Sequence, residues 1–161
     1  MTAFLFLDLG TKTGYAVGDF SDAGQTVVTG TELFENDKFS GGGARMLAFR
    51  RWLTKMHDLF GFTEVGYEGV RAHKGVDAAH IYGGLMGHLT AWCEEQGVAY
   101  SAETVQAIKK FATGKGNAPK EAVIAAVRDW GYAPADDNEA DAIAGLHLFA
   151  SEREITVDCR K

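Results

Sequence analysis

The sequence has few of the residues that are typical of disulfide-rich proteins, proteins with structural metal sites, disordered proteins or membrane proteins. Its two cysteines, Cys93 and Cys159, form no CxxC pair among 161 residues, so neither a disulfide framework nor a structural zinc site is expected. Only two prolines leave little room for a disordered linker. The apolar start, residues 1–9, is short, carries Asp8 and has no basic beginning, and no apolar run approaches the ~20 residues of a membrane span. We expect one soluble, cytoplasmic domain over residues 1–161.

Positive charge is scarce overall but locally concentrated. The net charge of -6 argues against a uniformly basic nucleic-acid-binding protein, because phosphate binding depends on Lys and Arg. Acidic residues gather between Asp136 and Asp141. The basic clusters are Arg71, His73 and Lys74 in one segment and Lys109, Lys110, Lys115 and Lys120 in another. This distribution suits a metal pocket flanked by basic segments.

Hydrophobic periodicity predicts an alternation of strands and helices. The expected strands cover residues 3–8, 15–17, 26–34, 62–68 and 98–102. The expected helices cover residues 46–60, 77–96, 104–113, 119–130 and 138–153. The order predicts an α/β fold with a mixed five-stranded sheet, in which the first three strands are antiparallel and helices cover both faces. It resembles the order of the RNase H-like fold.

Three acidic residues occupy positions that can converge. Asp8 ends the first strand in LDLGTKTGYAV, and Glu68 ends the fourth in VGYEGV, so two acids close neighbouring strands. Asp141 lies in DDNEADAIAGLHL, a helix otherwise rich in alanine and aliphatic residues. Helical spacing places both Asn138 and Asp137 on the face of Asp141, so either can supply a fourth ligand.

These oxygen ligands predict a metal-dependent hydrolase. Clustered acids repel one another unless a cation is present, and hard oxygen ligands suit Mg²⁺ or Mn²⁺. Two such ions, roughly 3.5–4 Å apart, activate a water and stabilise the leaving oxygen of a phosphodiester. Taken singly, each acid also fits a structural role: Asp8 as a turn residue, Glu68 as a strand end and Asp137 as a helix cap.

Together these motifs resemble the RuvC family of Holliday-junction resolvases. The shared features are an opening D-L-G-x-x-x-x-G, an E-x-V after a strand, a basic segment and a closing A-D-A-x-A helix. The resemblance spans nearly the whole chain and implies an RNase H-like homodimer that nicks four-way DNA junctions symmetrically under Mg²⁺. It implies that Asp8, Glu68 and Asp141 hold two metal ions per active site. It also suits a bacterial cell or a phage-infected host.

The stretch KKFATGKGNAPKEAV resembles the family segment whose two lysines contact DNA. The spacing assigns these roles to Lys109 and Lys120, with Lys115 in the same basic segment. Lys120 takes the position of the catalytic-site lysine, where a positive charge offsets the charge that develops on the scissile phosphate. A solvated helix start is the structural alternative for both Lys109 and Lys120.

The chain departs from the family pattern at two places. Family members commonly carry Asp or His where this chain has Asn138, so the fourth metal ligand stays open between Asn138, favoured by position, and Asp137. Arg71 stands where some relatives carry an aromatic wedge that unstacks the junction. Because arginine stacks on bases and binds phosphate, junction opening can persist while the sequence preference at the cut differs. His73 and Lys74 are expected to add phosphate contacts.

The helix expected over residues 77–96 resembles the family's dimer helix. Its apolar stripe and its small residues suit close approach of another helix, and a two-fold dimer presents two sites to a two-fold symmetric junction. The alternative is a helix that packs only on its own sheet. The stripe is Ile81, Leu85, Leu89 and Trp92, and the small residues are Gly83, Gly84 and Gly87.

Other functions use part of the same pattern. An RNase H acting on RNA:DNA hybrids, or a general flap and branched-DNA nuclease, uses the same metals and is told apart by substrate preference. A non-catalytic junction-binding protein would keep the basic residues without the metal chemistry. An actin-like ATPase fragment also has D-L-G-T after a strand, but those proteins need two lobes, and no second glycine-rich phosphate motif occurs here.

Overall fold

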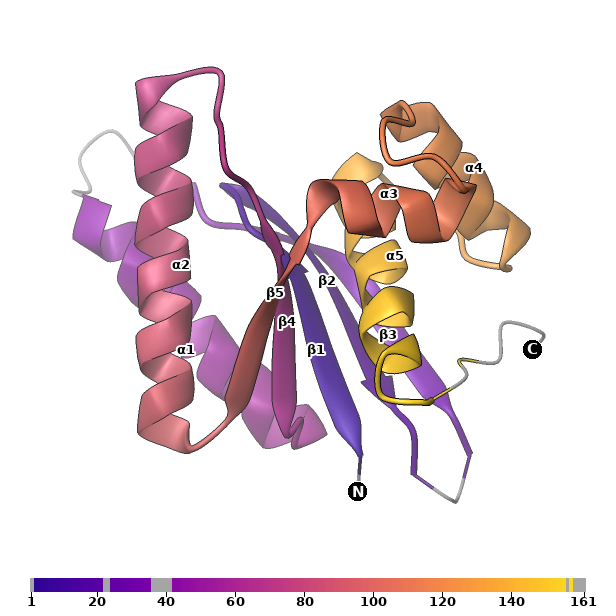
Figure 1. The fold of residues 1–161 in the computed structure, drawn as a ribbon. Helices are drawn as coiled ribbons and strands as arrows, with labels where there is room; N and C mark the ends of the chain where they lie inside the picture. Colours follow the sequence, from indigo (N-terminus) through magenta and orange to yellow (C-terminus); the bar gives the residue numbers. More distant parts are fainter. Residues whose placement is uncertain (1, 22–23, 36–41, 156, 158–161) are drawn as a thin grey trace.

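The computed structural model describes residues 2–21, 24–35, 42–155 and 157, so Cys159 lies outside the described part. Within these described ranges, five strands and five helices follow the expected order (Figure 1). The strands are β1 (Ala3–Asp8), β2 (Lys12–Asp19), β3 (Thr26–Leu33), β4 (Glu64–Gly69) and β5 (Ala99–Thr104). The helices are α1 (Gly42–Phe60), α2 (Val76–Gln96), α3 (Val105–Thr113), α4 (Lys120–Asp129) and α5 (Asp137–Ser151).

The strands form one mixed sheet in the order β3-β2-β1-β4-β5. β1 pairs antiparallel with β2, and β2 pairs antiparallel with β3, which is the predicted N-terminal meander. β4 joins the other side of β1 in parallel, and β5 joins β4 in parallel. The predicted mixed sheet is therefore confirmed, and β1 lies at its centre.

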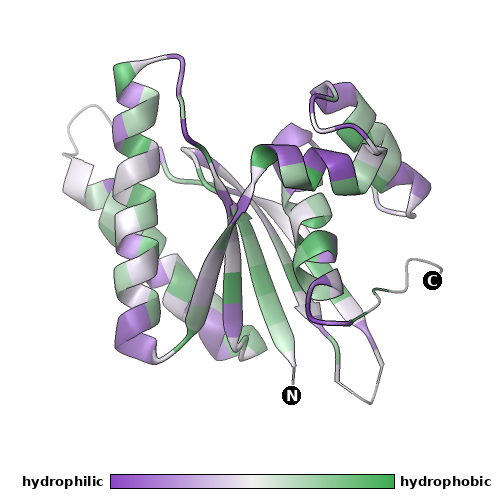
Figure 2. Cartoon of the chain, viewed as in Figure 1, coloured by the Kyte–Doolittle hydropathy of each residue, from purple (hydrophilic) through white to green (hydrophobic). Residues whose placement is uncertain are grey.

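Helices cover both faces of the sheet, as the sequence predicts (Figure 1). Leu5 and Leu7 of β1 face a core shared with α1 and α2. Phe4 and Phe6 point the other way, into a core shared with α3, α4 and α5. Because β1 is buried on both faces, it is an almost continuous apolar run, and Figure 2 shows its hydrophobic colouring.

The apolar stripe of α2 serves the protein's own core. Leu85, Leu89 and Trp92 are buried against α1 and the sheet, and Gly84 lets Met46 of α1 come close. Most of this stripe is therefore unavailable to a second subunit, because its own chain already covers it, while Ile81 is only half-buried. Gly83 and Gly87 differ, since a Cβ at either position would meet open space.

Element ends differ from the predicted ends by a few residues. β4 begins at Glu64 and extends one residue past Glu68, and α5 begins at Asp137 because Asp136 caps it. Such shifts are usual where two adjacent residues can both end an element. None of the helices in the described part of the chain combines the length and the hydrophobicity of a membrane-spanning segment.

Candidate metal centre

Two acidic residues lie side by side at one end of the sheet. Asp8 is the last residue of β1, and Glu68 is the last but one of β4. The parallel register pairs Leu7 with Tyr67, so Asp8 and Glu68 follow at one level of adjacent strands. Side chains alternate along a strand, which puts Asp8 on the same face as Phe6, beneath α5.

Helix α5 comes close to this face because two glycines leave room for it. A Cβ at Gly14 of β2 would lie 1.9 Å from the carbonyl oxygen of Asn138 in the first turn of α5. A Cβ at Gly145 would lie 2.0 Å from a ring carbon of Phe6. Gly145 is one helical turn after Asp141, so the two positions share a face of α5. The glycines thus set the depth at which α5 presents Asp141 to the strand ends.

The side chains of Asp8, Glu68 and Asp141 converge. One carboxylate oxygen from each lies within 4.8 Å of the others. Burial raises the pKa of Asp8 well above its ordinary 3.8, that of Glu68 from 4.5 to about 7, and that of Asp141 from 3.8 to about 6. Burial is the largest cause of each increase, and repulsion between neighbouring carboxylates contributes to it.

Asp137 adds a fourth negative charge next to the three. It is the first residue of α5, one turn before Asp141, and its charge raises the pKa of both Asp8 and Asp141. Asn138 follows it, with its backbone carbonyl packed against Gly14. Several carboxylate oxygens gathered in one place are the donor set of a hard divalent cation. The residues present therefore fit Mg²⁺ or Mn²⁺, whose charge would offset their repulsion.

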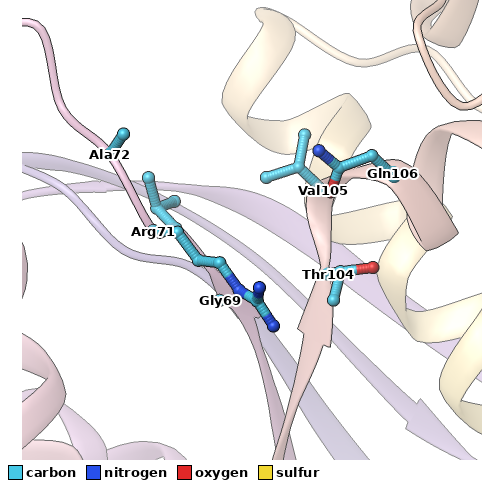
Figure 3. A pocket seen from close by; sticks show the side chains of 7 residues that line it. Gly69, Arg71, Ala72, Thr104, Val105 and Gln106 are labelled. Carbon is cyan, nitrogen blue, oxygen red and sulfur yellow. The ribbon is translucent and has the colours of Figure 1, made fainter.

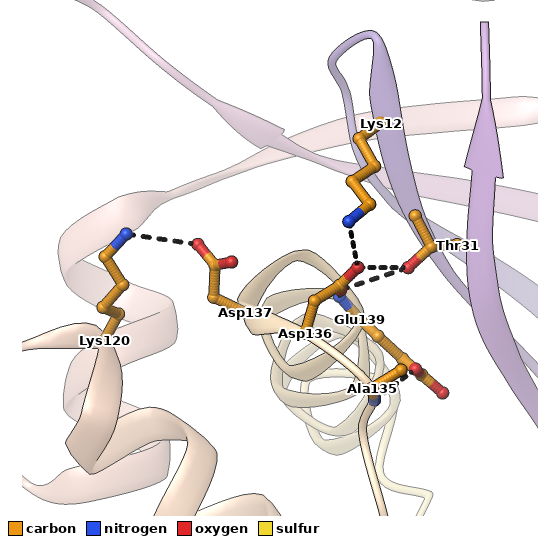
Figure 4. A network of polar contacts seen from close by, with 7 residues as sticks. All are labelled: Lys12, Thr31, Lys120, Ala135, Asp136, Asp137 and Glu139. Atoms are coloured by element: carbon orange, nitrogen blue, oxygen red, sulfur yellow. Dashed lines mark hydrogen bonds and ion pairs between the residues drawn. The ribbon is translucent and has the colours of Figure 1, made fainter.

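Two of the predicted lysines face this acidic cluster. Lys109 of α3 lowers the pKa of both Glu68 and Asp141, and Lys120 at the start of α4 lowers that of Asp141. The Nζ atom of Lys120 lies 3.5 Å from Oδ2 of Asp137 (Figure 4). Because the Lys120 side chain is 66% exposed, this ion pair is open to exchange with another anion.

Solved structures of Holliday-junction resolvases share this architecture. T. thermophilus RuvC in complex with a Holliday junction substrate superposes with a TM-score of 0.79 at 21% identity, over 96% of this chain and 97% of that one. A second structure of Thermus thermophilus RuvC gives a TM-score of 0.77 at 22% identity, over 95% of this chain and 97% of that one. The chain has the RuvC fold.

A more distant likeness extends to a eukaryotic protein. The yeast mitochondrial Holliday junction resolvase superposes with a TM-score of 0.61 at 14% identity, over 89% of this chain and 77% of that one. No family model matches the sequence, and no curated protein matches it. At these identities the likeness establishes the RuvC fold, and the case for chemistry depends on the acidic site itself.

The remaining predicted DNA-binding residues lie in two loops of the RuvC fold, between β4 and α2 and between α3 and α4. Arg71 and Lys74 are exposed in the loop between β4 and α2, and Lys115 is exposed after α3. His73 differs, because its ring packs with its centroid 4.9 Å from that of Tyr82. Its Nε2 atom is buried without a hydrogen-bond partner among the described residues. Arg71, Lys74 and Lys115 are thus open to a ligand, and a phosphate contact by His73 stays a prediction.

Sequence reasoning missed the polar contacts that hold the first turn of α5 (Figure 4). Asp136 is the N-cap, and its Oδ1 accepts a hydrogen bond from the Glu139 backbone N–H at 2.8 Å. Its Oδ1 also accepts a hydrogen bond from the Thr31 hydroxyl of β3 at 3.1 Å. Its Oδ2 lies 3.3 Å from Nζ of Lys12 of β2, which forms an ion pair. Asp136, not Asp137, is therefore the helix cap. The Asp137 carboxylate is left to act on Asp8 and Asp141 and to pair with Lys120.

Glu139 also holds the first turn of α5 against β3. Its buried carboxylate accepts the Thr29 hydroxyl of β3 at 2.7 Å and the Ala135 backbone N–H at 2.8 Å. An acidic cap followed three residues later by Glu is a capping-box pattern, so the D-D-N-E spacing contained a signal for Asp136 and Glu139. The pattern does not show which strand the pair would contact.

Proposed function

We propose that this protein is a Mg²⁺-dependent endonuclease that resolves four-way DNA junctions by symmetric paired nicks. The supporting observation is the convergence of Asp8, Glu68 and Asp141 on a fold shared with Holliday-junction resolvases. A fold alone does not determine an activity. The proposal therefore depends on the acidic donor set, which suits phosphodiester hydrolysis with divalent ions.

The carboxylates and the two lysines of the site would have separate roles in this reaction. The three carboxylates would hold two Mg²⁺ ions, or Mn²⁺ in their place, after losing their protons. Such ions, when bound, supply an activated water and neutralise charge on the phosphate oxygens. Lys109 attracts the phosphates of the strand to be cut. Lys120 turns from Asp137 to the scissile phosphate and stabilises the charge that develops there. The products carry a 5′-phosphate and a 3′-hydroxyl.

The fourth ligand comes from the first turn of α5. The charge of Asp137 already acts on Asp8 and Asp141, which supports a carboxylate ligand at this position. Asn138 would supply an amide oxygen, a weaker ligand for a hard cation. Asp137→Asn should raise the Mg²⁺ concentration for half-maximal cleavage about tenfold, and Asn138→Ala much less. The opposite order would assign the ligand to Asn138, and a gain of cleavage in Asn138→Asp would show that the amide limits activity.

Junction binding would use the exposed basic residues around the site and a two-fold dimer. Arg71, Lys74 and Lys115 are exposed. They would contact the DNA together with Lys109 and Lys120. The dimer would use the exposed face of α2, where Gly83 and Gly87 leave room for a neighbouring helix. Gly83→Arg should give monomers by light scattering. A dimer that persists in this variant would place the interface elsewhere.

The decisive experiment compares cleavage of a mobile four-way junction with cleavage of duplex DNA, a flap and an RNA:DNA hybrid. Symmetric nicks should appear with Mg²⁺ and be lost in Asp8→Asn and Asp141→Asn. Asp58→Asn, an exposed acid on α1, is the matched control and should cut normally. Cutting of the hybrid alone would make the protein an RNase H. Tight junction binding without cutting would make it a junction-binding protein, and ATP hydrolysis without nuclease activity would favour the ATPase alternative.

A further inference from the structure

We propose that Tyr82 of α2 is a positioning residue for the metal ligand Glu68. This inference rests on the proposed nuclease function and deepens it, because it names a residue that would set metal affinity without binding the metal. The Tyr82 hydroxyl lies between two backbone groups on either side of Gly69. It donates a hydrogen bond to the Glu68 carbonyl oxygen at 2.8 Å and accepts one from the Val70 N–H at 3.1 Å.

The sheet gives the end of β4 only partial support. β4 pairs with β1 as far as Tyr67, so Glu68 lies beyond the last β1 pair, and pairing with β5 ends one residue after it. Residues 69–72 then border a cavity of about 470 Å³, whose other side is formed by residues 104–106 (Figure 3). Packing against the start of α3 therefore does not fix this segment. The two hydrogen bonds of Tyr82 hold it where the ladder to β1 has ended.

Tyr82 is itself held firmly. Its side chain is buried in the core that α2 shares with α1 and the sheet. The ring of His73 packs on it, with the two ring centroids 4.9 Å apart. A hydroxyl has one proton to donate and lone pairs that accept, and both capacities are used here. Because the core fixes the ring, the hydroxyl has a defined position from which it orients the Glu68 backbone.

The orientation of the Glu68 backbone matters because its carboxylate must converge with two others. One oxygen each from Asp8, Glu68 and Asp141 lies within 4.8 Å of the others, and a turn of the chain at Glu68 would move its oxygen out of this group. Burial raises the pKa of Tyr82, and the charges of Glu68 and Asp8 add to the increase, so the hydroxyl keeps the proton that it donates. Groups that orient a metal ligand commonly change metal affinity by tenfold or more when they are removed.

The test is Tyr82→Phe, which removes the hydroxyl and keeps the ring. Calorimetric titration with Mn²⁺, without DNA, should show affinity reduced about tenfold. The Mg²⁺ concentration for half-maximal junction cleavage should rise by the same factor, while saturating Mg²⁺ restores the rate to within a few-fold of wild type. A purely structural loss would lower the rate equally at every Mg²⁺ concentration. Tyr100→Phe, an exposed tyrosine whose hydroxyl bonds to Glu94, is the matched control and should bind Mn²⁺ normally.

Two further variants test whether Tyr82 acts through Glu68. In a Glu68→Gln background, Tyr82→Phe should weaken Mn²⁺ binding no further, because both changes act on the same ligand. His73→Ala removes the ring that packs on Tyr82 but keeps the hydroxyl, and should weaken Mn²⁺ binding by a smaller factor. This second variant decides the question if Tyr82→Phe does not fold.

The outcomes separate this role from the proposed function. Unchanged Mn²⁺ affinity in Tyr82→Phe, or in His73→Ala if the first variant does not fold, would overturn the role of Tyr82, as would a full additional loss in the Glu68→Gln background. Junction cleavage with an unaltered Mg²⁺ requirement in Tyr82→Phe would do the same and leave the nuclease standing. Weakened Mn²⁺ binding in Tyr82→Phe, together with no cleavage of any branched DNA by the wild type, would support the role of Tyr82 and refute the nuclease. A wild type that binds no Mn²⁺ would refute both.

Discussion

Asp141→Asn is expected to stabilise the metal-free protein at pH 8, although it removes a predicted catalytic residue. Burial and the charge of Asp137 raise the pKa of Asp141 from 3.8 to about 6. Between about pH 4 and pH 6 the folded protein therefore keeps a proton that the unfolded chain has already released. The free energy of unfolding falls as pH rises through this range. The difference between these pKa values corresponds to about 3 kcal/mol of destabilisation at pH 8.

The expected gain in the free energy of unfolding is smaller than the full electrostatic destabilisation. Asparagine removes the charge but leaves a polar group buried among the remaining acids, so we expect a gain of about 1–2 kcal/mol. For a domain of this size, that gain raises Tm by roughly 3–6 °C. Below pH 4 the carboxyl is protonated in both states, so the variant and the wild type should melt within about a degree of each other.

The assay is thermal unfolding of both proteins at pH 4 and pH 8, with and without saturating Mg²⁺. Mg²⁺ should stabilise the wild type at pH 8, because ligand binding favours the folded state, and should stabilise the variant much less. Asp58→Asn, with its exposed side chain, should change neither melting nor the response to Mg²⁺. A variant less stable than wild type at pH 8 without metal would refute the argument that the clustered charges destabilise the fold.

Three further changes test how the site is built. Gly14→Ala should lower both stability and Mg²⁺ affinity, since the new methyl would lie 1.9 Å from the Asn138 carbonyl oxygen, and a Mg²⁺ titration of thermal unfolding measures both. Glu139→Ala should destabilise by about 2–3 kcal/mol in urea unfolding, because two hydrogen bonds to its carboxylate are lost. In a Cys159→Ser background, Cys93 should resist alkylation until the protein unfolds, because burial raises its pKa to about 12.

Each of these changes has its own control. Gly43→Ala, on the open side of α1, should leave Mg²⁺ affinity unchanged, and an equal loss in both glycine variants would show that the close approach at Gly14 is unimportant. Unaltered urea unfolding in Glu139→Ala would mean that β3 does not hold α5 in place. Rapid alkylation of the native protein would show that the Cys93 region opens readily.

The acidic residues could be predicted because their signals are local. Asp8 and Glu68 each end an apolar strand, and Asp141 interrupts an alanine-rich helix, so each is unusual within a few residues of sequence. The cap of α5 shows the limit of such signals, because either Asp136 or Asp137 satisfies the local rule. Contacts of Asp136 with Thr31 and Lys12, far away in the sequence, decide between them.

The sequence by itself determined the order of the elements, the mixed sheet and the identity of the converging acids, because strand and helix periodicity and strand-end residues are local properties. Only the tertiary structure decided what each surface contacts. Periodicity shows that α2 has an apolar stripe, but packing shows that α1 and the sheet cover most of it. In the same way, Gly14 becomes informative only when Asn138 lies against it, and Tyr82 becomes informative only because its hydroxyl reaches the Glu68 backbone.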